Sequence, residues 1–268
     1  MNTRPPSLTV PEDSAGGDIP TLDWLGEPVD CTRCEHQALR ESGGCELGRS
    51  CMQDAYARRI DRFFRTHPEL AVQHLKHAYF EVRAIAARWV DVFQLPSLLT
   101  DPDETVRLQV ALRIPERWLL RMRQDPHREV RIRVAMRLAE GELLPLRDDP
   151  DYQVRTMVAR RLPSALLASM IEDRDDEVRR EVARRVGMPA LMRLAADPSP
   201  DVRRIVANRL PEPLLHLLDG DEDVIVAHTL AERRGATAPE QDAAATTRGP
   251  HAPSLAPVAR ATSEKHHG

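Results

Sequence analysis

The sequence predicts an all-α fold, a solenoid of 24-residue repeats that follows a small domain with four cysteines. A valine recurs every 24 residues over most of the chain, and each valine stands in a short segment with helical spacing. All four cysteines fall within residues 31–51, which predicts a compact site for a metal or cluster. The recurring valines are Val82, Val106, Val130, Val154, Val178, Val202 and Val226.

Each repeat is predicted to contain one amphipathic helix. Val106, Val110 and Ile114 illustrate the pattern, because apolar residues four positions apart lie on one face of a helix. An alanine follows the second of these positions in every repeat, and its small side chain lets a neighbouring helix approach closely. The alanines are Ala87, Ala111, Ala135, Ala159, Ala183, Ala207 and Ala231.

Aspartate and proline mark the ends of these helices. An aspartate recurs at one position and precedes proline in four repeats, which predicts an N-cap followed by a first-turn proline. Asp101-Pro102-Asp103-Glu104 also resembles a capping box. Proline or glycine follows the apolar stripe in four repeats, so the expected helix length is about 12 residues. The aspartates are Asp101, Asp125, Asp149, Asp173, Asp197 and Asp221, and the terminating residues are Pro115, Pro163, Gly187 and Pro211.

The second part of each repeat is predicted to be a short 3₁₀ turn. A leucine recurs at one position, and leucine or methionine stands three residues later, a spacing that suits 3₁₀ geometry. The repeat is too short for the two full helices of other helical-repeat families, which need about 34 to 47 residues, and the strand pattern of ordinary leucine-rich repeats is missing. The leucines are Leu95, Leu119, Leu143, Leu167, Leu191 and Leu215, and their partners are Leu98, Met122, Leu146, Met170, Leu194 and Leu218.

The repeat from Asp149 to Pro163 follows the pattern D-P-x-x-x-V-R-x-x-V-A-x-R-L-P. This pattern resembles the repeat of the leucine-rich repeat variant family, and the resemblance covers roughly residues 60–234. It implies a right-handed superhelix of alternating α and 3₁₀ helices. We therefore assign residues 59–234 to a repeat array of this kind.

Two arginine columns run through the array. They predict either a phosphate-binding surface, which would favour nucleic acid as a ligand, or contacts that join one repeat to the next. The second interpretation is favoured, because acidic residues such as Asp175, Asp176 and Glu177 occur in the same repeats and weaken any positive field. The first column points into the apolar arc, where the aspartates and helix-end carbonyls are candidate acceptors. The columns are Arg83, Arg107, Arg131, Arg155, Arg179 and Arg203, and Arg113, Arg137, Arg161, Arg185, Arg209 and Arg233.

Cys31, Cys34, Cys45 and Cys51 are the candidate metal ligands. Four thiolates suit either tetrahedral zinc or an iron-sulphur cluster, and the spacing leaves both open, with a slight lean toward a cluster. Two disulfides would be unusual in a reducing compartment. Members of the leucine-rich repeat variant family can carry an N-terminal domain in which four cysteines bind a [4Fe-4S] cluster. The resemblance therefore implies a cluster domain at residues 23–58, with structural zinc as the alternative.

The segment after the cysteines is predicted to be helical and to cap the open end of the array. Tyr56, Phe63 and Phe64 have helix-like spacing in this segment. A group of histidines, His67, His74 and His77, suggests a second metal site, but no carboxylate or thiolate partner is evident. We therefore expect these histidines to lie at the surface.

Composition limits the function further. The net charge is −4, and no apolar run approaches the roughly 20 residues that span a membrane, so we expect a cytoplasmic protein with disordered tails at residues 1–22 and 235–268. No catalytic motif is present, which predicts a protein that is not an enzyme. The leading hypothesis is an iron-sulphur protein that binds another protein and responds to redox state. Electron transfer to a docked enzyme and nucleic-acid binding along the arginine columns are the alternatives.

Overall fold

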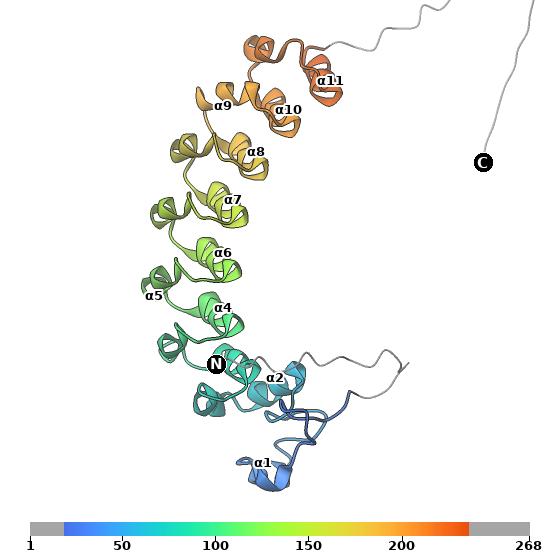
Figure 1. Ribbon diagram of the computed structural model, residues 1–268, viewed down its shortest axis with the longest axis vertical. Helices are drawn as coiled ribbons and strands as arrows, with labels where there is room; N and C mark the ends of the chain where they lie inside the picture. The colour runs from blue at the N-terminus through green and yellow to red at the C-terminus, as the bar shows by residue number, and fades with distance from the viewer. Residues whose placement is uncertain (1–18, 236–268) are drawn as a thin grey trace, which may run out of the picture.

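The computed structural model describes residues 19–235, which form an elongated, curved stack of helical units (Figure 1). The α-helices of successive units lie on the inner side of the curve, and the 3₁₀ segments lie on its outer side (Figure 1). Within this part of the chain the only strand-like features are two isolated bridges, Leu22 with Pro28 and Glu46 with Ser50. The prediction of an all-α solenoid is confirmed.

Each repeat contributes one α-helix of 10 residues, somewhat shorter than predicted. Ile114, which precedes Pro115, has the extended geometry that a following proline favours, with φ −59° and ψ 142°. The predicted prolines do stand directly after helix ends, but Leu138 has the same geometry before Ala139, so proline is not required for the stop. The helices are α3 (Phe80–Trp89), α4 (Glu104–Arg113), α6 (Arg128–Arg137), α7 (Tyr152–Arg161), α8 (Asp176–Arg185), α10 (Pro200–Arg209) and α11 (Val224–Arg233).

The predicted N-cap position is wrong by two residues. The N-cap of α4 is Asp103, whose carboxylate accepts a hydrogen bond from the Thr105 N–H at 2.8 Å. Asp101 lies in the preceding turn, where it accepts from the Asp103 N–H at 2.9 Å and pairs with Arg83. The recurring aspartate is therefore held by an arginine of the preceding repeat and does not cap a helix.

The second part of each repeat is a 3₁₀ segment, as predicted, and two repeats add a single α-helical turn before it. The recurring leucines are fully buried or nearly so, so each segment closes its repeat by packing a leucine into the core. The segments are η3 (Leu95–Leu98), α5 (Glu116–Leu119), η4 (Leu120–Met122), η5 (Glu140–Glu142), η6 (Leu144–Leu146), η7 (Ser164–Met170), α9 (Ala190–Arg193), η8 (Leu194–Ala196) and η9 (Glu212–Leu218).

The core is one continuous row of buried side chains along the stack. The recurring valines are 0% exposed from Val82 to Val226, and the alanine column is 0% exposed from Ala87 to Ala207. Such alanines let adjacent helices approach closely, and a larger side chain there would force the repeats apart. Ala231 in the final helix is exposed, because no further repeat covers it within the described residues.

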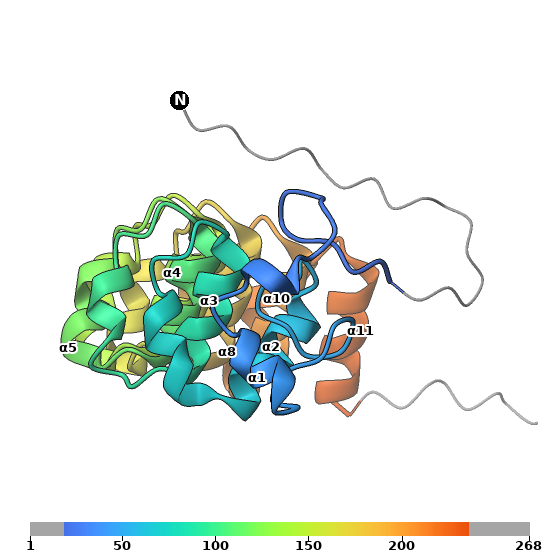
Figure 2. The same cartoon turned by 90° about the horizontal axis from the view of Figure 1, so that it is seen from below.

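The N-terminal elements close the other end of the stack, and Figure 2 looks at the molecule from this end. Phe63 and Phe64 are buried beneath α3, so the predicted cap is confirmed. Arg59 fixes the preceding chain, because its guanidinium donates to the Ile19 and Pro20 carbonyls at 2.6 and 3.0 Å. The backbone of residues 19 and 20, assigned to the N-terminal tail by sequence, is therefore held by hydrogen bonds, and residues 1–18 and 236–268 of the two tails lie outside the described residues. The elements are η1 (Cys31–Arg33), α1 (Gln37–Glu41), α2 (Ala57–Thr66) and η2 (Pro68–His74).

Candidate metal centre

The first two cysteines occupy the two ends of one short 3₁₀ turn. Cys31 begins η1, and Cys34 ends it with its backbone N–H donating to the Cys31 carbonyl at 3.4 Å. Asp30 caps the turn, because its carboxylate accepts from the N–H of Thr32 at 2.9 Å and from the Thr32 hydroxyl at 2.6 Å. The C-x-x-C segment is thereby held in a defined turn.

The other two cysteines flank a tight loop. Cys45 and Cys51 stand immediately outside the bridge between Glu46 and Ser50, whose N–H groups each donate to the other's carbonyl at 2.8–2.9 Å. Gly48 inside this loop has φ +74°, a conformation that side chains disfavour. The bridge thus holds together the two chain segments from which Cys45 and Cys51 project.

Gly44 permits close packing beside Cys45. A Cβ atom at Gly44 would lie 3.2 Å from the Leu39 carbonyl oxygen and 3.3 Å from the His67 ring. The His67 ring in turn forms a hydrogen bond of 2.7 Å with the Gly44 carbonyl. We conclude that glycine is needed at this position, because a side chain would push the cysteine loop away from the cap of the array.

Burial and mutual repulsion disfavour ionisation of these thiols. Burial is the main cause that raises the pKa of Cys34, of Cys45 and of Cys51, the last to about 11. Negative charge on Cys34 and Cys31 raises the pKa of Cys45 further, and Asp54 together with the same two cysteines raises that of Cys51. A positively charged metal or cluster would remove this penalty by binding the thiolates.

The spacing of the sulphurs tests which group the site fits. Among residues 19–235, no three cysteine sulphurs lie within 4.8 Å of one another, and none of the four cysteines forms a disulfide. A tetrahedral zinc ion with Zn–S bonds of about 2.3 Å would hold its sulphurs about 3.8 Å apart. An iron-sulphur cluster spaces its cysteines more widely, because each sulphur can bind a different iron atom. Four cysteine thiolates are also the usual donor set of an iron-sulphur cluster.

We expect the cluster-free protein to release about four protons per chain when its four cysteines bind Zn²⁺ or Co²⁺ at pH 7. The reason is that ordinary thiols are protonated at this pH and the pKa values of Cys34, Cys45 and Cys51 are raised further, whereas metals bind thiolates. Metal affinity should rise with pH for the same reason. Calorimetric titrations under anaerobic conditions, in buffers with different ionisation enthalpies, count the protons. A binding heat that does not depend on the buffer would contradict the prediction.

The histidines do not lie at the surface as predicted. His74 is 3% exposed, and its Nε2 forms a 2.9 Å hydrogen bond with Nε2 of His36, which is 8% exposed. Burial lowers the pKa of His74 to about 4 and also lowers the pKa of His36. Both rings are therefore neutral near pH 7, so one can donate and the other accept.

This histidine pair connects the cysteine segment to the array. His36 follows the C-x-x-C turn, and its backbone N–H donates to the Cys34 sulphur at 3.4 Å. His74 ends η2, which packs against α3. His36 was missed by sequence reasoning, because its partner lies 38 residues away and no local pattern indicates the contact. The carboxylate of Glu35 is 3.8 Å from Nδ1 of His74, so an acidic neighbour is present after all.

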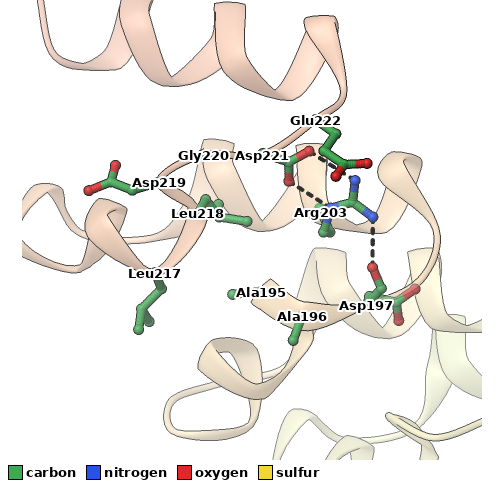
Figure 3. A pocket seen from close by; sticks show the side chains of 10 residues that line it. All are labelled: Ala195, Ala196, Asp197, Arg203, Leu217, Leu218, Asp219, Gly220, Asp221 and Glu222. Atoms are coloured by element: carbon green, nitrogen blue, oxygen red, sulfur yellow. Dashed lines mark hydrogen bonds and ion pairs between the residues drawn. The ribbon is translucent and has the colours of Figure 1, made fainter.

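The first arginine column joins each repeat to the next. Each guanidinium forms a two-pronged pair with the recurring aspartate 18 residues later, with Nε–Oδ2 distances of 2.7–2.8 Å and Nη2–Oδ1 distances of 2.8–3.0 Å. Figure 3 shows Arg203, which binds Asp221 and also the Asp197 carbonyl. This inter-repeat interpretation of the column is confirmed.

The second arginine column caps helices of the preceding repeat. From Arg113 to Arg233, each Nη1 donates to the carbonyl of an alanine 26 residues earlier, at 2.5–2.8 Å. These carbonyls belong to the last turn of a helix, where no N–H within the helix is left to bind them. Both columns thus bind acceptors inside the protein, and few of their donors remain for an external phosphate.

None of the helices within residues 19–235 combines the length and the apolar character that crossing a membrane requires.

Known proteins resemble both parts of the chain. Residues 21–73 match the family model described as "LRV protein FeS4 cluster". An uncharacterised 27.7 kDa protein from the nifB 3′ region of Rhodobacter capsulatus is 53% identical over 94 residues, which are 35% of this chain and 38% of that protein. The matched region thus spans well under half of that relative.

A solved structure resembles nearly the whole described chain. It is described as a leucine-rich repeat variant with a novel repetitive structural motif, and it is 39% identical to this chain. The match covers 80% of this chain and 95% of the other, with a TM-score of 0.74.

Proposed function

We propose a function from the premise that this chain belongs to the leucine-rich repeat variant family and carries that family's iron-sulphur domain. It is a non-catalytic protein whose [4Fe-4S] cluster reports redox state to a protein partner, and this partner binds along the repeats. Cys31, Cys34, Cys45 and Cys51 would hold the cluster, which supplies one-electron redox chemistry when bound. Such a site requires reduced thiols, so we place the protein in the cytoplasm.

The contact between His36 and His74 carries the proposal. Their 2.9 Å hydrogen bond is buried and ties the segment of Cys34 to η2, the element on which the first repeat packs. The His36 N–H also donates to the Cys34 sulphur, and hydrogen bonds to ligand sulphurs change strength with the charge of a cluster. A change in the charge of the cluster would therefore alter hydrogen bonds that connect the Cys34 segment to the capping end of the array.

Side chains on the repeats support protein as the partner. Leu112 and Met136 occupy equivalent positions in α4 and α6, and each is 42% exposed. Exposed apolar side chains at equivalent positions of neighbouring helices favour contact with protein. Nucleic acid is a weaker alternative, because both arginine columns bind acceptors inside the protein.

Electron transfer is the second candidate function. Cys31, Cys34 and Cys45 are only partly buried, so a cluster held by them would lie close to the surface. An electron carrier needs that access and does not need any response of the repeats.

The cluster is tested by anaerobic purification, followed by visible absorption before and after dithionite. We expect a broad band that bleaches on reduction, with about four iron atoms and four sulphides per chain, as a [4Fe-4S] cluster requires. A colourless protein with one zinc ion would contradict the proposal.

Hydrogen exchange of the oxidised and reduced forms tests the coupling. We expect different protection in peptides from α2, η2 and α3, and unchanged protection in α8 and α10, which are far from the cluster. His74→Gln should remove this difference, whereas the control His228→Gln, which changes an exposed side chain of α11, should retain it. Identical exchange in both redox states would sink the sensing role and leave electron transfer as the better assignment.

A further inference from the structure

Three arginines outside the two columns surround a pocket beside the cysteine loop. The pocket has a volume of about 420 Å³ and is lined by Arg49, Ser50, Arg62, Arg65 and Thr66. Arg49 and Ser50 belong to the loop between Cys45 and Cys51, and the other three residues lie on α2. The pocket therefore forms only when the loop folds back onto this helix.

The arginines of this pocket lack the partners that the column arginines have. Among residues 19–235, neither Arg62 nor Arg65 forms an ion pair, and Arg62 donates one hydrogen bond, to the Arg49 carbonyl at 3.2 Å. Arg49 pairs with Glu46 at 3.3 Å, but both side chains are largely exposed, so the pair is weak. Two guanidiniums without an ion pair, those of Arg62 and Arg65, thus share one hollow with the weakly paired guanidinium of Arg49.

Ser50 supplies a further donor. Its hydroxyl oxygen is buried and has no hydrogen-bond partner among the described residues. A buried hydroxyl without a partner costs free energy, so a ligand that accepts its hydrogen bond gains by removing that cost. Ser50 lines the pocket, and its backbone is held by the bridge to Glu46.

We propose that this pocket binds a phosphate group. Guanidiniums form paired hydrogen bonds with phosphate oxygens, and a tetrahedral group has enough oxygens to accept from several arginines and a hydroxyl together. The volume lies in the range typical of small-molecule sites, so a phosphate that is attached to a larger molecule also fits. The phosphate belongs either to a free small molecule or to a phosphorylated side chain of a partner protein. This inference does not depend on the redox role proposed above.

Calorimetric titration of the anaerobic, cluster-containing protein with inorganic phosphate tests the site, at constant ionic strength. The variant Arg62→Gln/Arg65→Gln should bind phosphate at least about tenfold more weakly, because two charged donors are lost. Ser50→Ala removes no charge and should weaken binding by about fivefold, the loss expected for one hydrogen bond. Retained visible absorption shows that each variant is folded around its cluster.

Arg58→Gln is the matched control, since Arg58 is an exposed arginine of α2 that does not line the pocket. It should leave the affinity within about twofold, because exposed charges at a distance are screened. The absence of saturable binding at millimolar phosphate overturns the proposal. Equal losses in Arg58→Gln and the pocket variant would also overturn it, because they would indicate general attraction to positive charge.

Two further probes identify the source of the phosphate. AMP represents a small phosphorylated molecule, and a phosphoserine peptide compared with its unphosphorylated form represents a modified partner. Tighter binding of one probe than of inorganic phosphate supports the pocket and assigns its source. If neither probe binds and inorganic phosphate also fails to bind, the pocket is not a phosphate site.

Discussion

Replacing Arg131 with methionine should lower the free energy of unfolding by about 3–5 kcal/mol, which is the usual cost of removing one partner of a buried ion pair and leaving the other charge buried. Nε and Nη2 of Arg131 bind the carboxylate of Asp149 at 2.8 and 3.0 Å, and Nη1 donates to the Asp125 carbonyl at 2.9 Å. The Asp149 side chain is only 4% exposed, so it would be left as a buried charge without its partner. Denaturant unfolding followed by circular dichroism measures the change.

The control for this substitution is Arg133→Met on the same helix. Arg133 is half-buried and forms no ion pair within residues 19–235, so its removal leaves no buried charge unpaired and should cost less than about 1 kcal/mol. Equal costs for Arg131→Met and Arg133→Met would show that the columns do not hold the repeats together. The double variant Arg131→Met/Asp149→Asn should recover part of the loss, because neither buried charge remains.

Replacing Cys34 with alanine should remove the cluster, so that iron falls from about four atoms per chain to nearly none and the visible band disappears. The apparent Tm should fall as well, by about 2–4 °C for each kcal/mol that the cluster contributes to a chain of this size. The reason is that Cys34 ends η1 and leads into His36, so a lost ligand also loosens the link to η2. Iron analysis and thermal unfolding of the same anaerobic sample provide both measurements.

The control is Ser42→Ala, an exposed residue in the same segment whose hydroxyl donates to the Ala38 carbonyl. Its iron content and absorption should match those of the unchanged protein. A Cys34→Ala protein that retains four iron atoms and its full Tm would contradict the assignment of Cys34 as a ligand.

The repeat architecture could be predicted from sequence because its pattern is local and recurs. Val106, Val110 and Ile114 define a buried stripe within one helix, and six further copies of the valine exclude coincidence. The same periodicity placed the arginines and their candidate acceptors. The repetition thus made it possible to predict contacts between the arginines and acceptors in neighbouring repeats, which a single copy of the unit would not have indicated.

The error at the helix starts has a physical explanation. Asp101 and Asp103 each belong to a column of equivalent positions spaced 24 residues apart. From the sequence, either of these two columns could have contained the N-caps. The true cap position also contains Ser199 and His127, because different residues are tolerated there. The column from Asp101 to Asp221 contains only aspartate. The reason is that its residues form two-pronged pairs with arginine, and such a pair needs a carboxylate.

The histidine pair and the basic pocket could not be predicted in this way. His36 contacts His74, and Arg49 and Arg65 line one pocket, only after the cysteine segment folds onto α2 and η2. This segment occurs once in the chain, so no second copy marks the residues that face one another. The cysteines were evident because four thiols in 21 residues have few other uses, whereas single histidines and arginines have many.

The distance between Arg131 and Asp149 along the chain has a consequence for how the protein can change in size. Each such pair crosses one boundary between repeats, over 18 residues, and no pair reaches beyond the adjacent repeat. A whole unit can therefore be inserted or deleted, and every remaining arginine still has an aspartate 18 residues ahead. The curved stack can thus be lengthened or shortened by whole units, and the separation between its cysteine-bearing end and α11 changes while the pairing between adjacent repeats stays the same.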